Sequence, residues 1–195
     1  MCLYRLFVKH YSNTLKLGVA CCAILLVFAG LTSAYASEND DFTNKIKVAF
    51  TYKIIQFIEL TDDPGSKSNG FVTICVITGK QLDRLFADLE GREINGDKVK
   101  VLFLSQSPSS SDQCGVLYIG NSEQARLPQI LQQIAPPNKI LTVSDIDQFA
   151  RLGGMVELKI HEKGVKMEIN VSNVTNAGIR ISSKLLEVAH IVQRD

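Results

Sequence analysis

The histidines of this chain are not spaced for catalysis or for metal binding. Beyond the N-terminal segment the sequence has His161 and His190, and neither has a cysteine or carboxylate at the spacing that a metal site or a catalytic triad uses. We therefore expect both to be solvated surface side chains. The sequence predicts no metal centre.

Asp145 and Asp147 are the acidic side chains best placed for chemistry. They follow a short apolar segment, and α/β proteins often keep catalytic groups directly after a strand. Ser144 offers a second interpretation, which we favour, in which its hydroxyl caps a helix whose first turn is rich in acid. Because no further groups complete a catalytic set, we expect a binding or regulatory protein, not an enzyme, with no cofactor.

The N-terminus has the pattern of a secretory signal peptide. Arg5, Lys9 and Lys16 come without any acidic residue, an apolar run follows over residues 17–30, and a small-x-small sequence ends at Ala36. We predict a signal peptide over residues 1–36, cleaved after Ala36, and an exported domain over residues 37–195. An uncleaved membrane anchor is the alternative, although the run is shorter than the roughly 20 residues of a spanning helix.

Export determines how the cysteines are counted. Of the five in the chain, Cys2, Cys21 and Cys22 would leave with the signal peptide, so that Cys75 and Cys114 remain. In an oxidising compartment such a pair most simply forms a disulfide, and a reactive thiol or a metal pair is the less favoured alternative. The bridge would close a loop of about 40 residues, worth on the order of 4 kcal/mol.

Length and charge restrict the remaining function classes. A chain of 195 residues fits one domain of ordinary size. Without the three basic residues of the signal, 18 basic side chains face 20 acidic ones, a net charge of −2. A slightly acidic domain lacks the basic surface that nucleic-acid binding requires, so we expect no nucleic-acid partner.

The first expected element is a helix over residues 44–60 with two apolar stripes. Helical spacing relates Ile46, Phe50, Ile54 and Phe57, which we expect to form the core face. The second stripe lies on the opposite side and consists of Val48, Tyr52 and Ile55. Either the domain covers this stripe as well or a partner does.

Strands and helices then alternate. Apolar runs rich in β-branched residues predict strands over residues 71–78, 99–104, 116–119 and 140–143. Helical patterns between them predict helices over residues 81–89 and 123–134, the second capped by Asn121 or Ser122. This order indicates a single α/β domain with a mainly parallel central sheet flanked by helices.

The last quarter of the chain has a different pattern. Strict alternation of apolar and polar residues over 156–161 and 165–171, with a turn at 162–164, predicts an antiparallel β-hairpin with one solvated face. Residues 183–192 have the pattern of an amphipathic helix that closes the domain. Asn170 and Asn173 also begin triplets of the glycosylation type, which are common by chance.

Five segments in order resemble one known family. They cover residues 47–59, 71–77, 141–145, 149–155 and 177–186, and include Gly-Gly-Met at 153–155 and Ile-Ser-Ser-Lys-Leu-Leu at 181–186. The chain resembles the YfiR family of periplasmic proteins over nearly all of residues 42–192.

The resemblance implies a regulator that acts by protein contact. YfiR-like proteins hold an inner-membrane diguanylate cyclase inactive by binding its periplasmic sensor domain, and an outer-membrane lipoprotein of the OmpA type can sequester them. Less cyclic di-GMP then means less biofilm. The resemblance also implies a disulfide between Cys75 and Cys114. Some members have a second, redox-sensitive pair in the segment that reads 147–154 here, where this chain has no cysteine.

Two surfaces are the predicted partner contacts. One is the stripe of Val48, Tyr52 and Ile55, and the other is the hairpin region, represented by Phe149, Ile160 and Ile169. Core packing is the alternative for both, and a second copy of the chain is a further candidate partner. The rival function is a periplasmic small-ligand sensor subunit that reports to another membrane protein, such as a histidine kinase.

Overall fold

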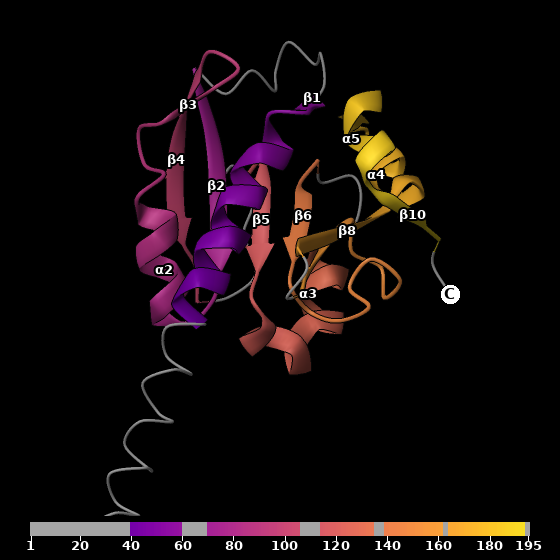
Figure 1. Ribbon diagram of the computed structural model, residues 1–195, viewed down its shortest axis with the longest axis horizontal. Coiled ribbons are helices and arrows are strands. Elements are labelled where there is room, and N and C mark those ends of the chain that lie inside the picture. Colours follow the sequence, from indigo (N-terminus) through magenta and orange to yellow (C-terminus); the bar gives the residue numbers. More distant parts are fainter. Residues whose placement is uncertain (1–39, 60–69, 106–113, 135–138, 162–163, 194–195) are drawn as a thin grey trace, which may run out of the picture. The chain divides into compact units, whose positions relative to one another are not determined.

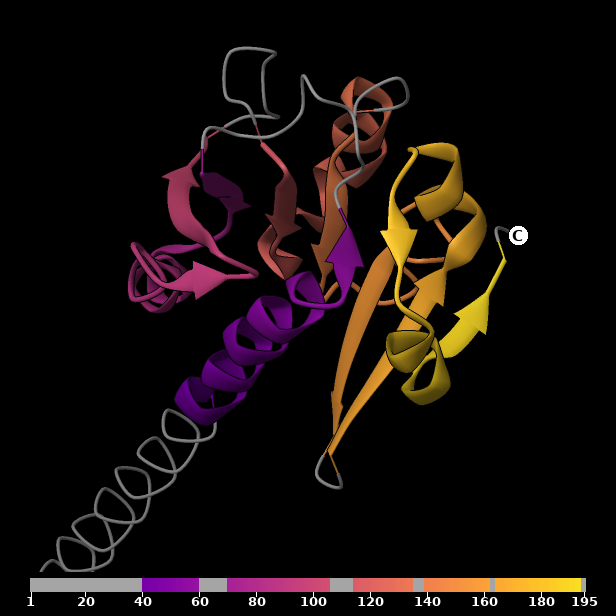
Figure 2. The same cartoon turned by 90° about the horizontal axis from the view of Figure 1, so that it is seen from above.

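A mixed sheet lies at the centre of the domain, with helices on both of its faces (Figures 1 and 2). The computed structural model describes residues 40–59, 70–105, 114–134, 139–161 and 164–193. Residues 44–195 form one compact unit and residues 1–43 another. Among the described residues, eight strands form the sheet in the order β10-β8-β7-β6-β5-β2-β4-β3. Their bounds are β2 Phe71–Ile77, β3 Glu93–Ile94, β4 Asp97–Phe103, β5 Val116–Ile119, β6 Leu141–Ser144, β7 Val156–His161, β8 Gly164–Asn170 and β10 His190–Val192.

The pairing of these strands is mainly parallel, as the sequence predicts. β2 pairs in parallel with both β4 and β5, β5 with β6, and β6 with β7. β7 and β8 form the predicted antiparallel hairpin, and β3 and β4 form a second one around the turn at Asn95 and Gly96. Every residue of β5 and β6 is buried, which explains their unbroken apolar runs, since helices cover both faces.

The two faces of the sheet have separate cores. Val48 and Ile55 of the N-terminal helix (residues 40–55) and Phe86 of α2 (Lys80–Ala87) pack on one face. Leu127 and Ile130 of α3 (Leu127–Gln133) pack on the other. The helix predicted over residues 81–89 is present as α2, which ends two residues earlier; Phe86 and Leu89 are buried, and Leu82 and Leu85 pack against the same core.

Several predicted helix ends are wrong. The N-terminal helix ends at residue 55, because residues 58–59 form strand β1 (Ile58–Glu59) and pair with β9 (Arg180–Ile181). The helix expected over 123–134 begins as a 3-10 helix, η1 (Asn121–Arg126), before α3. Gly120 precedes η1, and no side chain caps it.

The C-terminal segment differs most from the prediction. A short helix that the sequence analysis missed, α4 (Val171–Asn176), follows β8 and is capped by the side chain of Asn170. The predicted closing helix is only α5 (Ser183–Val188). From Ala189 the backbone is extended, and the β-branched residues of β10 pair in parallel with β8 instead of continuing the helix.

The predicted signal peptide, residues 1–36, lies outside the described residues. Within the part of the chain that is described, every helix falls short of the length or the apolar character that crossing a membrane requires.

Candidate interaction surface

The N-terminal helix is rotated relative to the sequence-based expectation. Val48 and Ile55, expected on the outer stripe, are buried in the core, and Tyr52 is half-buried with its hydroxyl donating to the Glu93 carbonyl at 2.6 Å. Of the residues expected in the core, Ile54 is buried as predicted and Ile46 is half-buried, but Phe50 and Phe57 are exposed. Val48 and Ile55 therefore cannot meet a partner unless the helix leaves the sheet.

The inner face of the helix also contains two buried polar residues. Asn44 and Thr51 lie on the inner face of the helix together with Val48 and Ile55. The Thr51 hydroxyl donates to the carbonyl of Lys47 at 2.8 Å, so its burial costs little. Since both stripes are apolar, periodicity alone could not tell which one faces the sheet.

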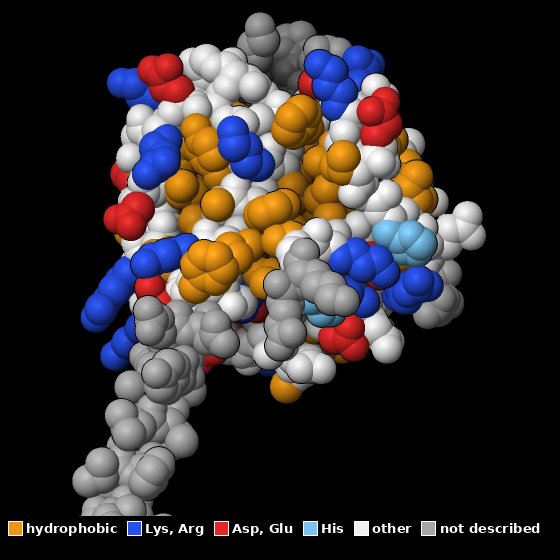
Figure 3. All heavy atoms as spheres, in the orientation of Figure 1, with side chains coloured by type: hydrophobic (Ala, Val, Ile, Leu, Met, Phe, Trp, Pro, Cys, Tyr) orange, Lys and Arg blue, Asp and Glu red, His pale blue; other side chains and the backbone are white. Residues whose placement is uncertain are grey.

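Hydrophobic side chains gather on one face of the molecular surface. Figure 3 shows them across the face that carries the N-terminal helix and continuing toward the C-terminal segment, with both basic and acidic side chains around them. Phe50 is 39% and Phe57 37% exposed. Next to Phe57, the backbone N–H of Ser182 donates to the Phe57 carbonyl at 2.9 Å, which joins the helix end to β9 and α5. Exposed apolar groups that gather in this way mark interaction sites.

The second predicted surface is largely interior. Phe149 and Ile169 are fully buried and Ile160 is half-buried. Leu152, in the loop between β6 and β7, is a large apolar side chain of this region that reaches solvent, 53% exposed. The sequence analysis did not single out Leu152, and an apolar residue within Arg-Leu-Gly-Gly was the available signal.

The polar face of the hairpin is not the solvated face that the alternation predicts. Glu157, Glu168 and Asn170 are buried, because the loop over residues 145–155 folds over them. The Glu157 carboxylate accepts the backbone N–H groups of Gln148 at 2.9 Å and Ala150 at 3.3 Å. The Glu157 carboxylate thereby holds the backbone of the loop over residues 145–155 against β7.

Lys159 and Lys166 form ion pairs with the buried carboxylates of Glu157 and Glu168. Lys159 Nζ lies 3.2 Å from Glu157, 3.4 Å from Asp147 and 3.6 Å from Glu168. Lys166 Nζ lies 3.0 Å from Glu168. Burial opposes the ionisation of Glu168, but Lys166 and Lys159 outweigh it and lower the pKa of Glu168. Burial likewise opposes the charge of Lys159, and the Glu157 and Glu168 carboxylates reverse this and raise its pKa.

Two asparagines hold the other side of the same loop. Asn170 Nδ2 donates to the Ala150 carbonyl at 2.9 Å, and Asn173 Nδ2 donates to the carbonyls of Gly153 at 2.9 Å and Gly154 at 3.0 Å. Gly154 also lies directly on the Phe149 ring, where an added Cβ would come within 2.2 Å of the ring. The side-chain amides of both glycosylation-type triplets are therefore occupied by the fold.

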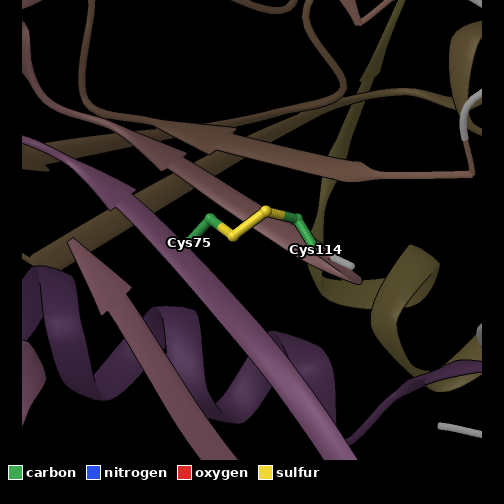
Figure 4. The surroundings of a disulfide bond; sticks show 2 residues. All are labelled: Cys75 and Cys114. Atoms are coloured by element: carbon green, nitrogen blue, oxygen red, sulfur yellow. A yellow bond between two sulfur atoms is a disulfide. The ribbon is translucent and has the colours of Figure 1, made fainter. Parts of the chain in front are cut away.

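The disulfide predicted between Cys75 and Cys114 is present (Figure 4). It joins the middle of β2 to the residue two positions before β5, with the two Cα atoms 5.7 Å apart. Cys75 is fully buried among the apolar residues on the α3 face of the sheet. This is a structural position, shielded from solvent by the core.

Asp145 holds the N-terminal helix to the sheet. Its carboxylate lies 2.7 Å from the ammonium of Lys47. Burial and then the nearby Asp145 carboxylate raise the pKa of Tyr118 well above its usual value. The favoured capping interpretation holds in part, since Ser144 Oγ accepts the Ile146 N–H at 3.0 Å, but a turn follows and not a helix.

The histidines and acidic groups form no metal centre in the described part of the chain. His161 ends the outer part of β7 and is exposed, as expected. His190 is also exposed, although it begins β10 instead of lying in a helix. What the described residues offer for recognition is therefore surface shape and charge.

A comparison with protein families matches nearly the whole α/β unit. A family model described as YfiR/HmsC-like matches residues 44–190, from the start of the α/β unit to the first residue of β10. A search of curated proteins gives no match.

Proposed function

The chain belongs to the YfiR/HmsC-like family, known as periplasmic regulators of diguanylate cyclases, and on that premise we propose that it represses such an enzyme. It would bind the periplasmic sensor domain of an inner-membrane diguanylate cyclase and keep the enzyme inactive. Cyclic di-GMP and biofilm would then fall. The observation that carries the proposal is the family match over residues 44–190, which includes nearly every described element.

Repression of this kind requires no chemistry from the chain itself. A binding protein shifts a two-state partner by its difference in affinity for the two states. Moving the cyclase from 99% active to 99% inactive takes a preference of about 10⁴-fold, or about 5.5 kcal/mol. A few buried aromatic anchors at an interface can supply a difference of that size.

Release of the repressor would need a competitor for the same molecule. We assign this role to an OmpA-like outer-membrane lipoprotein, which would sequester the chain and so activate the cyclase. The sensor domain of the cyclase and the OmpA-like lipoprotein would both be reached from the periplasm, to which a signal peptide cleaved after Ala36 would direct the chain. N-terminal sequencing of the purified protein tests the cleavage site, and an intact Met1 on material from the cell interior would contradict it.

The function is tested by deleting the gene in its host. We expect cyclic di-GMP and biofilm to rise severalfold, to return with the gene restored, and to stay low when the cyclase gene is deleted as well. Unchanged cyclic di-GMP after deletion would refute the repressor function. A rise that persists without any cyclase partner would favour the small-ligand sensor with a different output.

A further inference from the structure

One of the two exposed phenylalanines lies on a helix that is fixed to the sheet, and the other lies in the turn directly after it. Lys47 is ion-paired to Asp145 at 2.7 Å, and Asn95 Nδ2 donates to the Gln56 carbonyl at 3.2 Å just beyond the helix end. Phe50 is on the helix and Phe57 is two residues past its end, and both side chains are exposed. Their exposure therefore belongs to the folded state and does not come from a loosely packed helix.

The surface continues from the helix into the C-terminal segment. Ile58 of β1 is paired with Ile181 of β9, and the Phe57 carbonyl accepts the N–H of Ser182. Ile181 and Leu186 are half-buried apolar side chains on this segment. Residues more than a hundred positions apart in the sequence therefore meet beside Phe57.

The border of this surface is basic. Lys53 lies on the helix three residues after Phe50 and so on the same side of it, and Lys184 is the second residue of α5. Both are exposed, and within the described ranges neither forms an ion pair, Lys53 having only a hydrogen bond to Gln56 at 3.3 Å. Among residues 44–59 and 180–188 the basic side chains number five and the acidic ones two, and of the five Lys47 is already paired with Asp145.

An apolar centre with a charged border is the anatomy of a protein interface. A second copy of this chain would set the same lysines against each other across a two-fold axis, which the charges disfavour. A lipid surface is also disfavoured, because the two phenyl rings are nearly two-thirds buried and do not protrude.

From these observations we infer that the surface centred on Phe50 and Phe57, with Ile181, Leu186, Lys53 and Lys184, binds a different protein through an apolar patch bordered by carboxylates. If the proposed function holds, that protein is the sensor domain of the cyclase, and this identification rests on it. The assignment of the surface holds whichever protein binds there.

Site-specific photo-crosslinking in the native host tests the inference on the full chain. A photoreactive phenylalanine analogue replaces Phe50 or Phe57, and in matched controls it replaces Phe71 or Phe103, which are 45% and 47% exposed on other elements. We expect a light-dependent protein adduct at positions 50 and 57 and not at the two controls.

Charge reversal then tests the border. Lys53→Glu with Lys184→Glu should lower the adduct yield at least threefold, whereas Lys98→Glu with Lys100→Glu, exposed residues of β4, changes the net charge equally and should leave it unchanged. Melting temperatures within 2 °C of the parent, an order-of-magnitude criterion of about 0.5 kcal/mol, exclude misfolding. If the Glu pair fails this criterion, the milder Lys53→Gln with Lys184→Gln replaces it.

Mass spectrometry of the adduct separates the outcomes. A charge-sensitive adduct to the cyclase supports both the surface and the proposed function, and one to another protein supports the surface while the proposed function fails. Four results would overturn the inference. These are an adduct to a second copy or to phospholipid, an adduct whose yield does not change on charge reversal, an equal yield at the control positions, and no adduct at all.

Discussion

The Cys75–Cys114 bond and the loop over residues 145–155 are both held in place, but by different means. The bond links β2 to the chain before β5, across a sequence separation of 39, and restricts mainly the unfolded chain. The loop depends on Glu157, Asn170 and Asn173, which act only in the folded state. The centre of the sheet should therefore respond to reductant and the loop to single side-chain changes and to acid.

Loss of the disulfide has the largest expected effect. Replacing both residues, Cys75→Ala with Cys114→Ala, should lower the free energy of unfolding by about 4 kcal/mol, because the closed loop is long. Urea denaturation of the purified protein measures this. Reductant should lower the midpoint of the wild type and leave that of the double variant unchanged, and a wild-type midpoint indifferent to reductant would contradict the assignment.

Glu157→Ala should have the next largest effect, about 3 kcal/mol, since it leaves two backbone N–H groups and the Lys159 ammonium without their carboxylate. Hydrogen exchange should quicken at Gln148 and Ala150. Glu157→Gln keeps an acceptor oxygen and should lose less. Equal losses for the two variants would show that the carboxylate acts by packing alone.

Gly154→Ala tests the close approach of the loop to its own aromatic ring. The new Cβ would overlap Phe149, so we expect a loss of about 2 kcal/mol from overpacking. Gly79→Ala is the matched control, because no atom lies within 4 Å of its Cβ position. Thermal unfolding compares the two, and a Gly154 variant as stable as the Gly79 variant would mean that the ring moves aside freely.

Acid should weaken the loop, with the smallest effect of the four. Because the pKa of Glu168 is lowered in the folded protein, its contribution to stability is present above its pKa in the unfolded chain and is lost as the pH falls through the folded value. Hydrogen exchange of the loop amides at pH 7, 5 and 3 measures this loss of stability. Glu168→Gln should flatten the dependence, and an unaltered profile would place the titrating group elsewhere.

The sheet was predictable from sequence because its signals are local. Strands β5, residues 116–119, and β7, residues 156–161, have the predicted bounds, and β8 begins and ends one residue earlier than predicted. Buried β-branched runs and strict alternation need no knowledge of distant residues. The cysteine pair was also predictable, since the predicted signal peptide would leave only two cysteines in the exported domain.

The interaction surface was not predictable in the same way, because distant residues decide it. Lys47 finds its partner ninety-eight positions away at Asp145, and this contact helps to select which stripe of the helix is buried. The solvated face expected for the hairpin is covered by a loop that precedes it in the chain. Such tertiary contacts override periodicity, so Val48 and Ile55 were wrongly expected outside and Phe50 and Phe57 wrongly expected inside, while Ile54 is buried as predicted.

The antiparallel pair of β1 and β9 has a consequence for a truncated chain. Both cysteines of the disulfide lie within the first 114 residues, whereas Ile58 of β1 needs Ile181 of β9, 123 positions later in the chain. A chain truncated before β9 would keep the residues of its covalent bridge and lack the strand that pairs beside Phe57.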